Sequence, residues 1–182
     1  FCFWPGLRGR PGWKGAARSH AQICRRLLAC GVDEAVICED DVIFPADFDA
    51  RMAAVRRYLD AHPGWEMFSG QIADAAPDWP VLHADRTEGI TFAHLDRSVS
   101  MVFNILRRPV MEHLAAWDER DDDAFANTID RWLARRPTRV VVALPFLVGH
   151  RDGSTLRHAS ITQYDRLAGR SERLLMDKAA RV

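Results

Sequence analysis

The sequence lacks the features that mark membrane-spanning and disulfide-stabilised proteins. No apolar run approaches the roughly 18 residues that a membrane span needs, and no signal-peptide pattern is visible. The four cysteines contain no CxxC pair, which argues against a disulfide framework and favours free thiols in a reducing cytosol. We therefore expect a soluble, cytoplasmic protein in which Cys24 and Cys38 are small core residues without chemistry.

An excess of charge is also absent, since 25 Lys and Arg residues balance 25 Asp and Glu residues. Without a strong overall field, we expect no nucleic-acid partner. The charge is nevertheless uneven, because residues 1–32 contain several basic residues and no acidic one. This stretch either faces phosphate groups or forms a solvated basic surface, and the second is the commoner outcome.

The length and the 48% hydrophobic content suit one domain that spans residues 1–182 and buries most of its apolar surface. The chain begins without an initiating Met, inside the aromatic and turn-forming segment 1–6. We therefore expect that a preceding segment is missing from this chain.

Apolar spacing predicts helices that alternate with strands. Helical spacing marks residues 47–61 and residues 16–30, which Gly31 follows as a C-cap glycine. The continuous apolar run 34–38 predicts a strand buried on both faces, as in a parallel sheet. This order favours an α/β sheet with helices on its faces. The remaining expectations are a strand at 65–72, an irregular loop at 73–96, a half-buried strand at 98–106, a helix opened by Pro109, a helix after the acidic run 121–123 with Phe125 and Ile129 on its apolar stripe, a strand at 139–144 and a basic tail helix at 161–182.

Three consecutive carboxylates, Glu39, Asp40 and Asp41, follow directly after the apolar run. In a packed interior they repel one another unless a cation or hydrogen-bond donors compensate them. Side chains alternate along a strand, so Glu39 and Asp41 are expected to point to one side and Asp40 to the other. Two convergent carboxylates suit Mg²⁺ or Mn²⁺, whose shell water and substrate phosphates complete. An acidic turn without a metal is an equally open interpretation.

Several motifs surround the triplet in a characteristic order. The segment 15–20 ends in Ser19-His20 and is followed by a helix, Gly31, the apolar strand and the triplet. Weaker matches follow at Phe68-Ser69-Gly70-Gln71, at Thr128-Ile129-Asp130, and at 145–150 with Gly153-Ser154. Together, over residues 12 to about 160, these motifs resemble the family 25 glycosyltransferases and their relatives in lipopolysaccharide and oligosaccharide synthesis.

The resemblance implies a GT-A-like fold, a mixed sheet flanked by helices, whose first strand and nucleotide-base region would precede Phe1. It implies a hexosyltransferase, inverting in type, that moves a sugar from a nucleotide-sugar donor to a saccharide or lipid-linked acceptor, with a UDP-sugar as the expected donor. By carry-over, Asp41 and Glu39 hold Mn²⁺ or Mg²⁺, Glu39 also contacts the donor sugar, and Asp40 orients the donor.

Four further residues complete the predicted site. Asp130 is the base candidate, because inverting transfer needs a base near the acceptor hydroxyl, although an ordinary helix-surface Asp is as plausible. His20 is either a satisfied core histidine or a group that orients the carboxylates. Gln71 and His150 are expected to contact the donor or the metal, and a loop histidine without a role is an equal alternative for His150.

Other functions remain open on the sequence. Paired carboxylates at a strand end equally suit a metal-dependent nucleotidyltransferase or phosphohydrolase. A degenerate domain that binds a glycan or a protein partner without catalysis is also possible. The basic tail suits either a weak contact with an inner-membrane surface or a solvated or subunit-packing helix.

Overall fold

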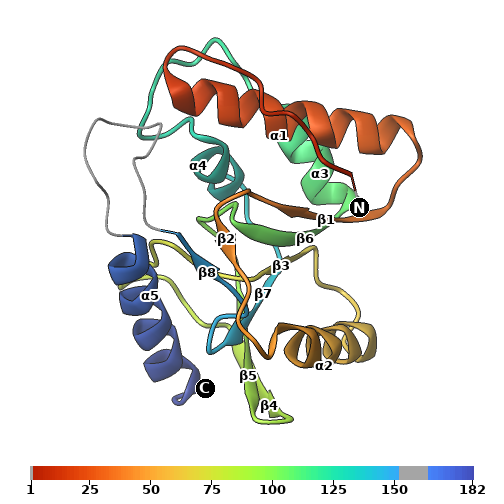
Figure 1. Ribbon diagram of the computed structural model, residues 1–182. Helices are drawn as coiled ribbons and strands as arrows, with labels where there is room; N and C mark the ends of the chain where they lie inside the picture. Colours follow the sequence, from red (N-terminus) through yellow and green to blue (C-terminus); the bar gives the residue numbers. More distant parts are fainter. Residues whose placement is uncertain (1, 152–163) are drawn as a thin grey trace.

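The strand segments pair into one six-stranded sheet with the order β1-β6-β3-β7-β5-β4, while β2 and β8 form a small second sheet (Figure 1). The computed structural model describes residues 2–151 and 164–182. Among the described strands, β3 and β7 run parallel and every other pair is antiparallel. The predicted α/β class with a mixed sheet is therefore confirmed. The strands are β1 (Glu34–Cys38), β2 (Val42–Ile43), β3 (Met67–Ser69), β4 (His83–Thr87), β5 (Ile90–Leu95), β6 (Phe103–Arg107), β7 (Val140–Leu144) and β8 (Gly149–His150).

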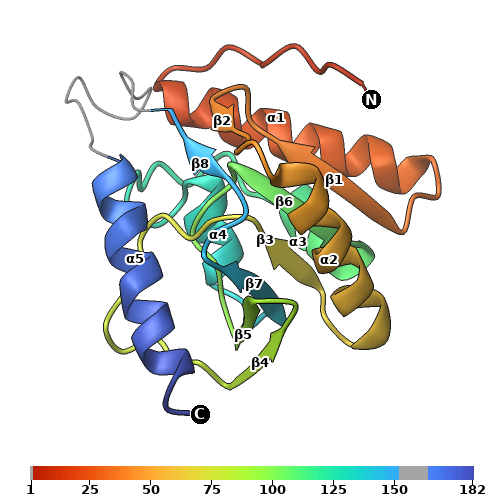
Figure 2. The same cartoon turned by 60° about the horizontal axis from the view of Figure 1, so that its bottom comes forward.

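Helices cover both faces of the large sheet, as two views of the ribbon show (Figures 1 and 2). Because strand side chains alternate, Met67 and Val142 lie in one buried cluster while the neighbouring Phe68 and Val141 lie in another. The first cluster includes residues of four helices and the second includes residues of one. The four are α1 (Gly12–Ala29), α3 (Arg108–Ala115), α4 (Ile129–Ala134) and α5 (Tyr164–Ala179), and the one is α2 (Phe48–Ala61).

The strand β1 differs from its prediction. It lies at the edge of the sheet and pairs antiparallel with β6, so it has no parallel neighbour. Val36 is 46% exposed and Cys38 is exposed, whereas Cys24 in α1 is buried as expected. The prediction of a strand buried on both faces was wrong, because a short apolar run does not distinguish a central strand from an edge strand. The strand β6, which was expected to be half-buried, is instead buried on both faces, as are β3 and β7.

The segment 73–96 is also more ordered than predicted, because β4 and β5 form a hairpin inside it. The turn of this hairpin consists of Glu88 and Gly89, which both have positive φ values, 52° and 76°. Two consecutive residues in this conformation form the tight connection that suits the twist of paired strands. The missed signal was Glu-Gly directly before the β-forming residues of β5, although β4 itself has few such residues.

The acidic run 121–123 does not cap a helix, so this prediction was wrong. The helix α4 begins at Ile129, with Thr128 at its N-cap position. Asp123 instead accepts backbone hydrogen bonds from Phe125 and Ala126 within a turn. Phe125 is 79% exposed and contributes nothing to an apolar stripe. The short acidic side chains accept hydrogen bonds from backbone N–H groups of the loop, which is a common alternative to capping a helix.

The tail helix α5 packs against the domain. Leu175 and Ala168 are buried, and Ser171 accepts a hydrogen bond from the backbone of Ala75 at 2.8 Å. Lys178 donates to backbone carbonyl oxygens of the segment that precedes β4. Part of the apolar face that membrane contact would use is thus buried within the domain. No helix in the described ranges is long and apolar enough to cross a bilayer.

Candidate functional site

The carboxylate triplet lies in the turn that connects β1 with β2. The strand β1 ends at Cys38, so the expected alternation along a strand does not apply to the triplet. Two backbone bonds fix the turn: Glu39 N donates to Val102 O at 2.9 Å, and Arg151 N donates to Asp41 O at 2.8 Å. The second bond joins the turn to the small β2–β8 sheet, which determines where Asp41 lies.

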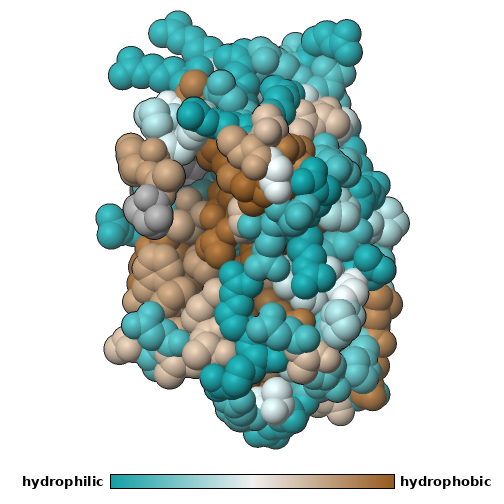
Figure 3. Space-filling model, turned by 90° about the vertical axis from the view of Figure 1, so that its right-hand side faces the viewer, coloured by the Kyte–Doolittle hydropathy of each residue, from teal (hydrophilic) through white to brown (hydrophobic). Residues whose placement is uncertain are grey.

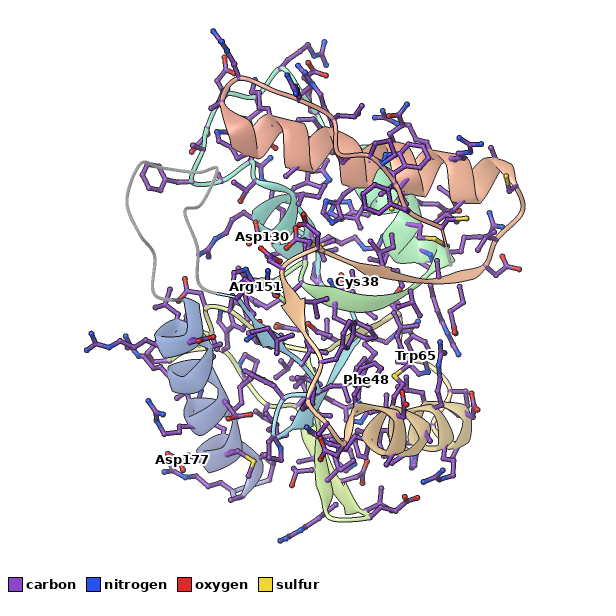
Figure 4. All side chains as sticks on the ribbon, in the orientation of Figure 1. Cys38, Phe48, Trp65, Asp130, Arg151 and Asp177 are labelled. Carbon is purple, nitrogen blue, oxygen red and sulfur yellow. The ribbon has the colours of Figure 1, made fainter. Side chains whose placement is uncertain are left out.

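All of the predicted site residues line one cleft of about 1290 Å³. They come from five separate parts of the chain: α1, the β1–β2 turn, the segment just after β3, the start of α4, and β8. Figure 4 shows Asp130 and Arg151 at this end of the sheet, while Phe48 and Trp65 lie toward α2. The fold therefore brings together residues that are more than 100 positions apart in sequence. The cleft-lining members of the predicted set are His20, Glu39, Asp40, Asp41, Gln71, Asp130 and His150.

His20 is fixed by its own helix. Its Nδ1 lies 3.0 Å from Ala16 O, and because a carbonyl can only accept, Nδ1 carries the hydrogen. Burial lowers the pKa of His20, so the ring is neutral near pH 7. Its Nε2 is then a lone-pair acceptor that faces Glu39 Oε1 at 3.9 Å. Two acceptors cannot hydrogen-bond to each other, so a proton or a cation between them would stabilise the pair.

Glu39 experiences the strongest charge crowding in the cleft. Desolvation, together with the charges of Asp41 and Asp130, raises its pKa to about 7. The side chain keeps 31% of its accessible surface, so solvent and ions reach it from the open side of the cleft. A group in this state holds a proton part of the time at neutral pH, and any bound cation would replace that proton.

Asp41 has the opposite electrostatic environment. His150, in β8, places Nε2 at 3.1 Å from Asp41 Oδ2, and hydrogen bonding from this imidazole lowers the pKa of Asp41. The β2–β8 register produces the contact, since Val42 pairs with His150. The other oxygen, Oδ1, is buried and has no hydrogen-bond partner among the described residues. Asp41 is thus an ionised carboxylate with one coordinating oxygen to spare.

Asp130 lies in the first turn of α4, where the helix dipole favours a negative charge. Its Oδ1 accepts hydrogen bonds from Thr128 Oγ1 at 2.6 Å and from Arg131 N at 2.9 Å. These bonds hold the carboxylate over the cleft rather than on the outer surface of the helix. The sequence analysis named Thr128 only as part of the Thr128-Ile129-Asp130 match and gave it no role, although a Thr two residues before an Asp at a helix start is a detectable signal.

The donor set fits a divalent cation that a substrate helps to hold. Among the described residues, no group of three or more His, Cys, Asp or Glu side chains is arranged to hold a metal ion. Mg²⁺, however, is usually bound through one or two carboxylates and completes its shell with water and substrate phosphates. Glu39 and Asp41 supply that number, and Asp41 has an oxygen, Oδ1, without a hydrogen-bond partner among the described residues.

The cleft extends from its acidic end into an apolar part that sequence reasoning missed. An N-terminal strap, residues 2–10, forms one wall through Phe3, Trp4 and Leu7, and β1 forms the opposite wall. The right-hand side of the molecule in Figure 1, seen face-on in Figure 3, carries a hydrophobic hollow bordered by hydrophilic side chains. Exposed Val36 on β1 is consistent with such a surface. The segment Gly153-Ser154, part of the resemblance, lies outside the described residues.

No protein-family model matches this chain, and no curated protein matches it significantly. The fold alone does not define an activity, because unrelated functions share such α/β architectures. The functional conclusion therefore depends on the chemistry of the cleft.

Proposed function

We propose that this chain is the catalytic domain of a metal-dependent glycosyltransferase with a GT-A-like fold, which moves a sugar from a nucleotide-sugar donor to a saccharide or lipid-linked acceptor. One observation carries the proposal: each motif of the family 25 resemblance that lies in the described residues contributes at least one residue to a single cleft. That clustering is what a shared donor site requires, and motif matches with no common role have no reason to converge.

Two carboxylates are the proposed ligands of Mn²⁺ or Mg²⁺, Asp41 through its spare oxygen and Glu39 beside it. When bound, such an ion supplies Lewis-acid stabilisation for the negative charge on a departing nucleoside diphosphate. His150 keeps Asp41 ionised and oriented, and neutral His20 faces Glu39 from α1. Gln71, which is buried at the end of β3, presents a side-chain amide to the same cleft and is the proposed donor-sugar contact.

Asp130 is the proposed general base for an inverting transfer. The hydrogen bonds from Thr128 and Arg131 hold its carboxylate in place. Asp130 and the triplet reach the cleft from different elements, the start of α4 and the β1–β2 turn. In this proposal the proton of the acceptor hydroxyl passes to Asp130 as the new glycosidic bond forms.

The test is calorimetric titration of UDP into the protein, with and without Mn²⁺, and into the Asp41→Asn variant. We expect metal-dependent binding in the wild type and at least about a tenfold loss of affinity in the variant, since charged ligand bonds contribute about 1.5 to 3 kcal/mol. Asp60→Asn, an exposed position on α2, makes the same chemical change away from the cleft and should bind as the wild type does.

The outcome also separates the competing functions. UDP binding that ignores both Mn²⁺ and Asp41 would sink the metal-dependent transferase. Release of pyrophosphate from a nucleoside triphosphate that is supplied with a sugar phosphate would indicate a nucleotidyltransferase. Release of inorganic phosphate from a phosphate ester would indicate a phosphohydrolase, whereas the transferase releases a nucleoside diphosphate from a nucleotide sugar. Glycan binding that Asp41→Asn leaves intact, with no turnover, would indicate a non-catalytic binding domain.

A further inference from the structure

A second cavity, of about 590 Å³, lies on the outer side of α1 next to the acidic cleft. The strap runs alongside α1 in both ribbon views and forms part of the cavity wall (Figures 1 and 2). Leu7 and Trp4 of the strap line both the cavity and the cleft, so the strap separates the two spaces. We call this cavity the basic pocket, and its charged and aromatic lining residues are Trp4, Arg18, Arg25, Arg26, Trp117 and Glu119.

The basic pocket carries an excess of positive charge. Three guanidinium groups line it against a single carboxylate, Glu119, which forms an ion pair with Arg18. Neither Arg25 nor Arg26 pairs with a carboxylate anywhere in the described part of the chain. Two further donors, Arg18 Nε and Trp4 Nε1, have no acceptor among the described residues. An anionic ligand would supply both the negative charge that balances the guanidinium groups and the acceptors that these two donors lack.

The guanidinium groups are held in place before any ligand arrives. Arg25 Nε donates to Ala115 O at 2.8 Å, which leaves the outer nitrogens of the same group for another acceptor. Arg26 lies over the ring of Trp4, 5.5 Å from its centroid. A guanidinium that is already positioned loses less conformational freedom on binding than a mobile one, so it binds an anion more strongly.

The geometry points to a phosphate-binding site in the basic pocket, which takes a phosphate ester carried by a sugar or a similar small molecule. Arginine matches phosphate because its planar fork donates two parallel hydrogen bonds to two oxygens. The indole of Trp4 on the strap suits an attached ring better than a free ion, since aromatic faces pack against apolar ring surfaces. This site is separate from the proposed donor site, and its existence does not depend on the glycosyltransferase proposal.

The test uses ¹⁵N-labelled protein in metal-free buffer at constant ionic strength, titrated with inorganic phosphate, with glucose 6-phosphate and with glucose. We expect saturable shifts of the Trp4 indole and Arg25 Nε signals with both phosphates and none with glucose. The double variant Arg25→Gln, Arg26→Gln should weaken phosphate binding at least about tenfold, given the usual contribution of charged hydrogen bonds. Tighter binding of glucose 6-phosphate than of phosphate would identify a sugar phosphate, and equal binding would assign the site to the phosphate group alone.

Two variants make the outcome decisive. The double variant Arg166→Gln, Arg170→Gln removes two exposed arginines of α5 and should bind phosphate as the wild type does. Asp41→Asn should also retain phosphate binding, which separates this site from the donor site. The proposal is overturned if no saturable shift appears, if both arginine pairs contribute equally, or if glucose alone reproduces the shifts.

Discussion

The acidic cleft and the basic pocket lie on either side of the same strap, and α1 lines both. Carboxylates predominate in the cleft, however, and guanidinium groups predominate in the pocket. In the cleft, burial together with the charges of neighbouring carboxylates raises the pKa of Glu39 to about 7. In the pocket, Arg25 and Arg26 are exposed to solvent. A hydrogen bond to Ala115 O holds Arg25, and the ring of Trp4 holds Arg26. The carboxylates of the cleft repel one another, and a bound cation would relieve that repulsion. The guanidinium groups of the pocket would instead attract an anion, and their arrangement costs the fold little.

The strap that separates the two sites gives the largest expected effect. A Cβ on Gly15 would lie 2.4 Å from Leu7 O and 2.8 Å from Gly9 N, both rigid backbone atoms. Gly15→Ala should therefore lower the free energy of unfolding by about 1 to 3 kcal/mol through overpacking. Urea denaturation measures this change, and loss of phosphate binding should accompany it because Trp4 moves with the strap.

The control for this prediction is a glycine in another helix. At Gly169 in α5 the nearest atom to an added Cβ is Arg173 Nη1, at 3.6 Å, the flexible end of a side chain. Gly169→Ala should raise the free energy of unfolding by about 0.5 to 1 kcal/mol, the usual gain in a helix interior. If both alanine variants are stabilised, the strap does not pack on α1 as described.

The charge crowding in the cleft gives the next largest effect. Glu39 has a raised pKa, so the folded state keeps a proton that the unfolded chain releases above pH 4.5. Stability contributed by this group is therefore present at low pH and is lost as pH rises from about 4.5 to about 7. In metal-free buffer at pH 8, Glu39→Gln should raise the free energy of unfolding by about 1 to 2 kcal/mol, with little change near pH 5.

Chemical denaturation across this pH range measures the effect, and Glu112→Gln on the exposed side of α3 is the matched control. That variant removes an equal charge where the structure shows no crowding, so its stability should follow the wild type at every pH. A Glu39→Gln variant that is no more stable at pH 8 would mean that solvent already screens the carboxylates from one another.

The smallest effect concerns the basic pocket without its ligand. Replacing Arg25 and Arg26 together by Gln should change the free energy of unfolding by less than about 0.5 kcal/mol, since both are exposed and unpaired with carboxylates. Thermal and urea unfolding of the double variant check this. A loss above about 1 kcal/mol would show that the bond to Ala115 and the stacking on Trp4 serve the fold rather than a ligand.

The sequence predicted which residues meet better than it predicted how they are held. Periodicity located α2 within a residue of its observed ends and found the chain segments of β1, β3, β6 and β7, but it did not find β8, which carries His150. It placed β1 wrongly, because the exposure of Val36 depends on strand order in the sheet, which one strand does not encode. For the same reason, the orientation of Glu39 and Asp41 follows from a turn that is pinned by Val102 and Arg151, not from strand alternation.

The basic pocket shows a different limit of sequence reasoning. The excess of basic residues in 1–32 was visible, but not their division among separate roles. Lys14 and Arg18 pair with acidic residues of the segment that follows α3, which is the ordinary structural outcome. Arg25 and Arg26 have no such partner because tertiary packing brings Ala115 and Trp4 to them instead. Only contacts over long sequence distances distinguish these two fates.

The position of the thiols makes the cleft open to chemical footprinting. Cys2, Cys30 and Cys38 are exposed and line the cleft, whereas Cys24 is buried and burial raises its pKa to about 12. An alkylating reagent therefore has three reporters along the cleft wall and one internal reference that reacts only on unfolding. Mass spectrometry of the alkylated peptides would map how far along the cleft any bound molecule extends, with no engineered label in the chain.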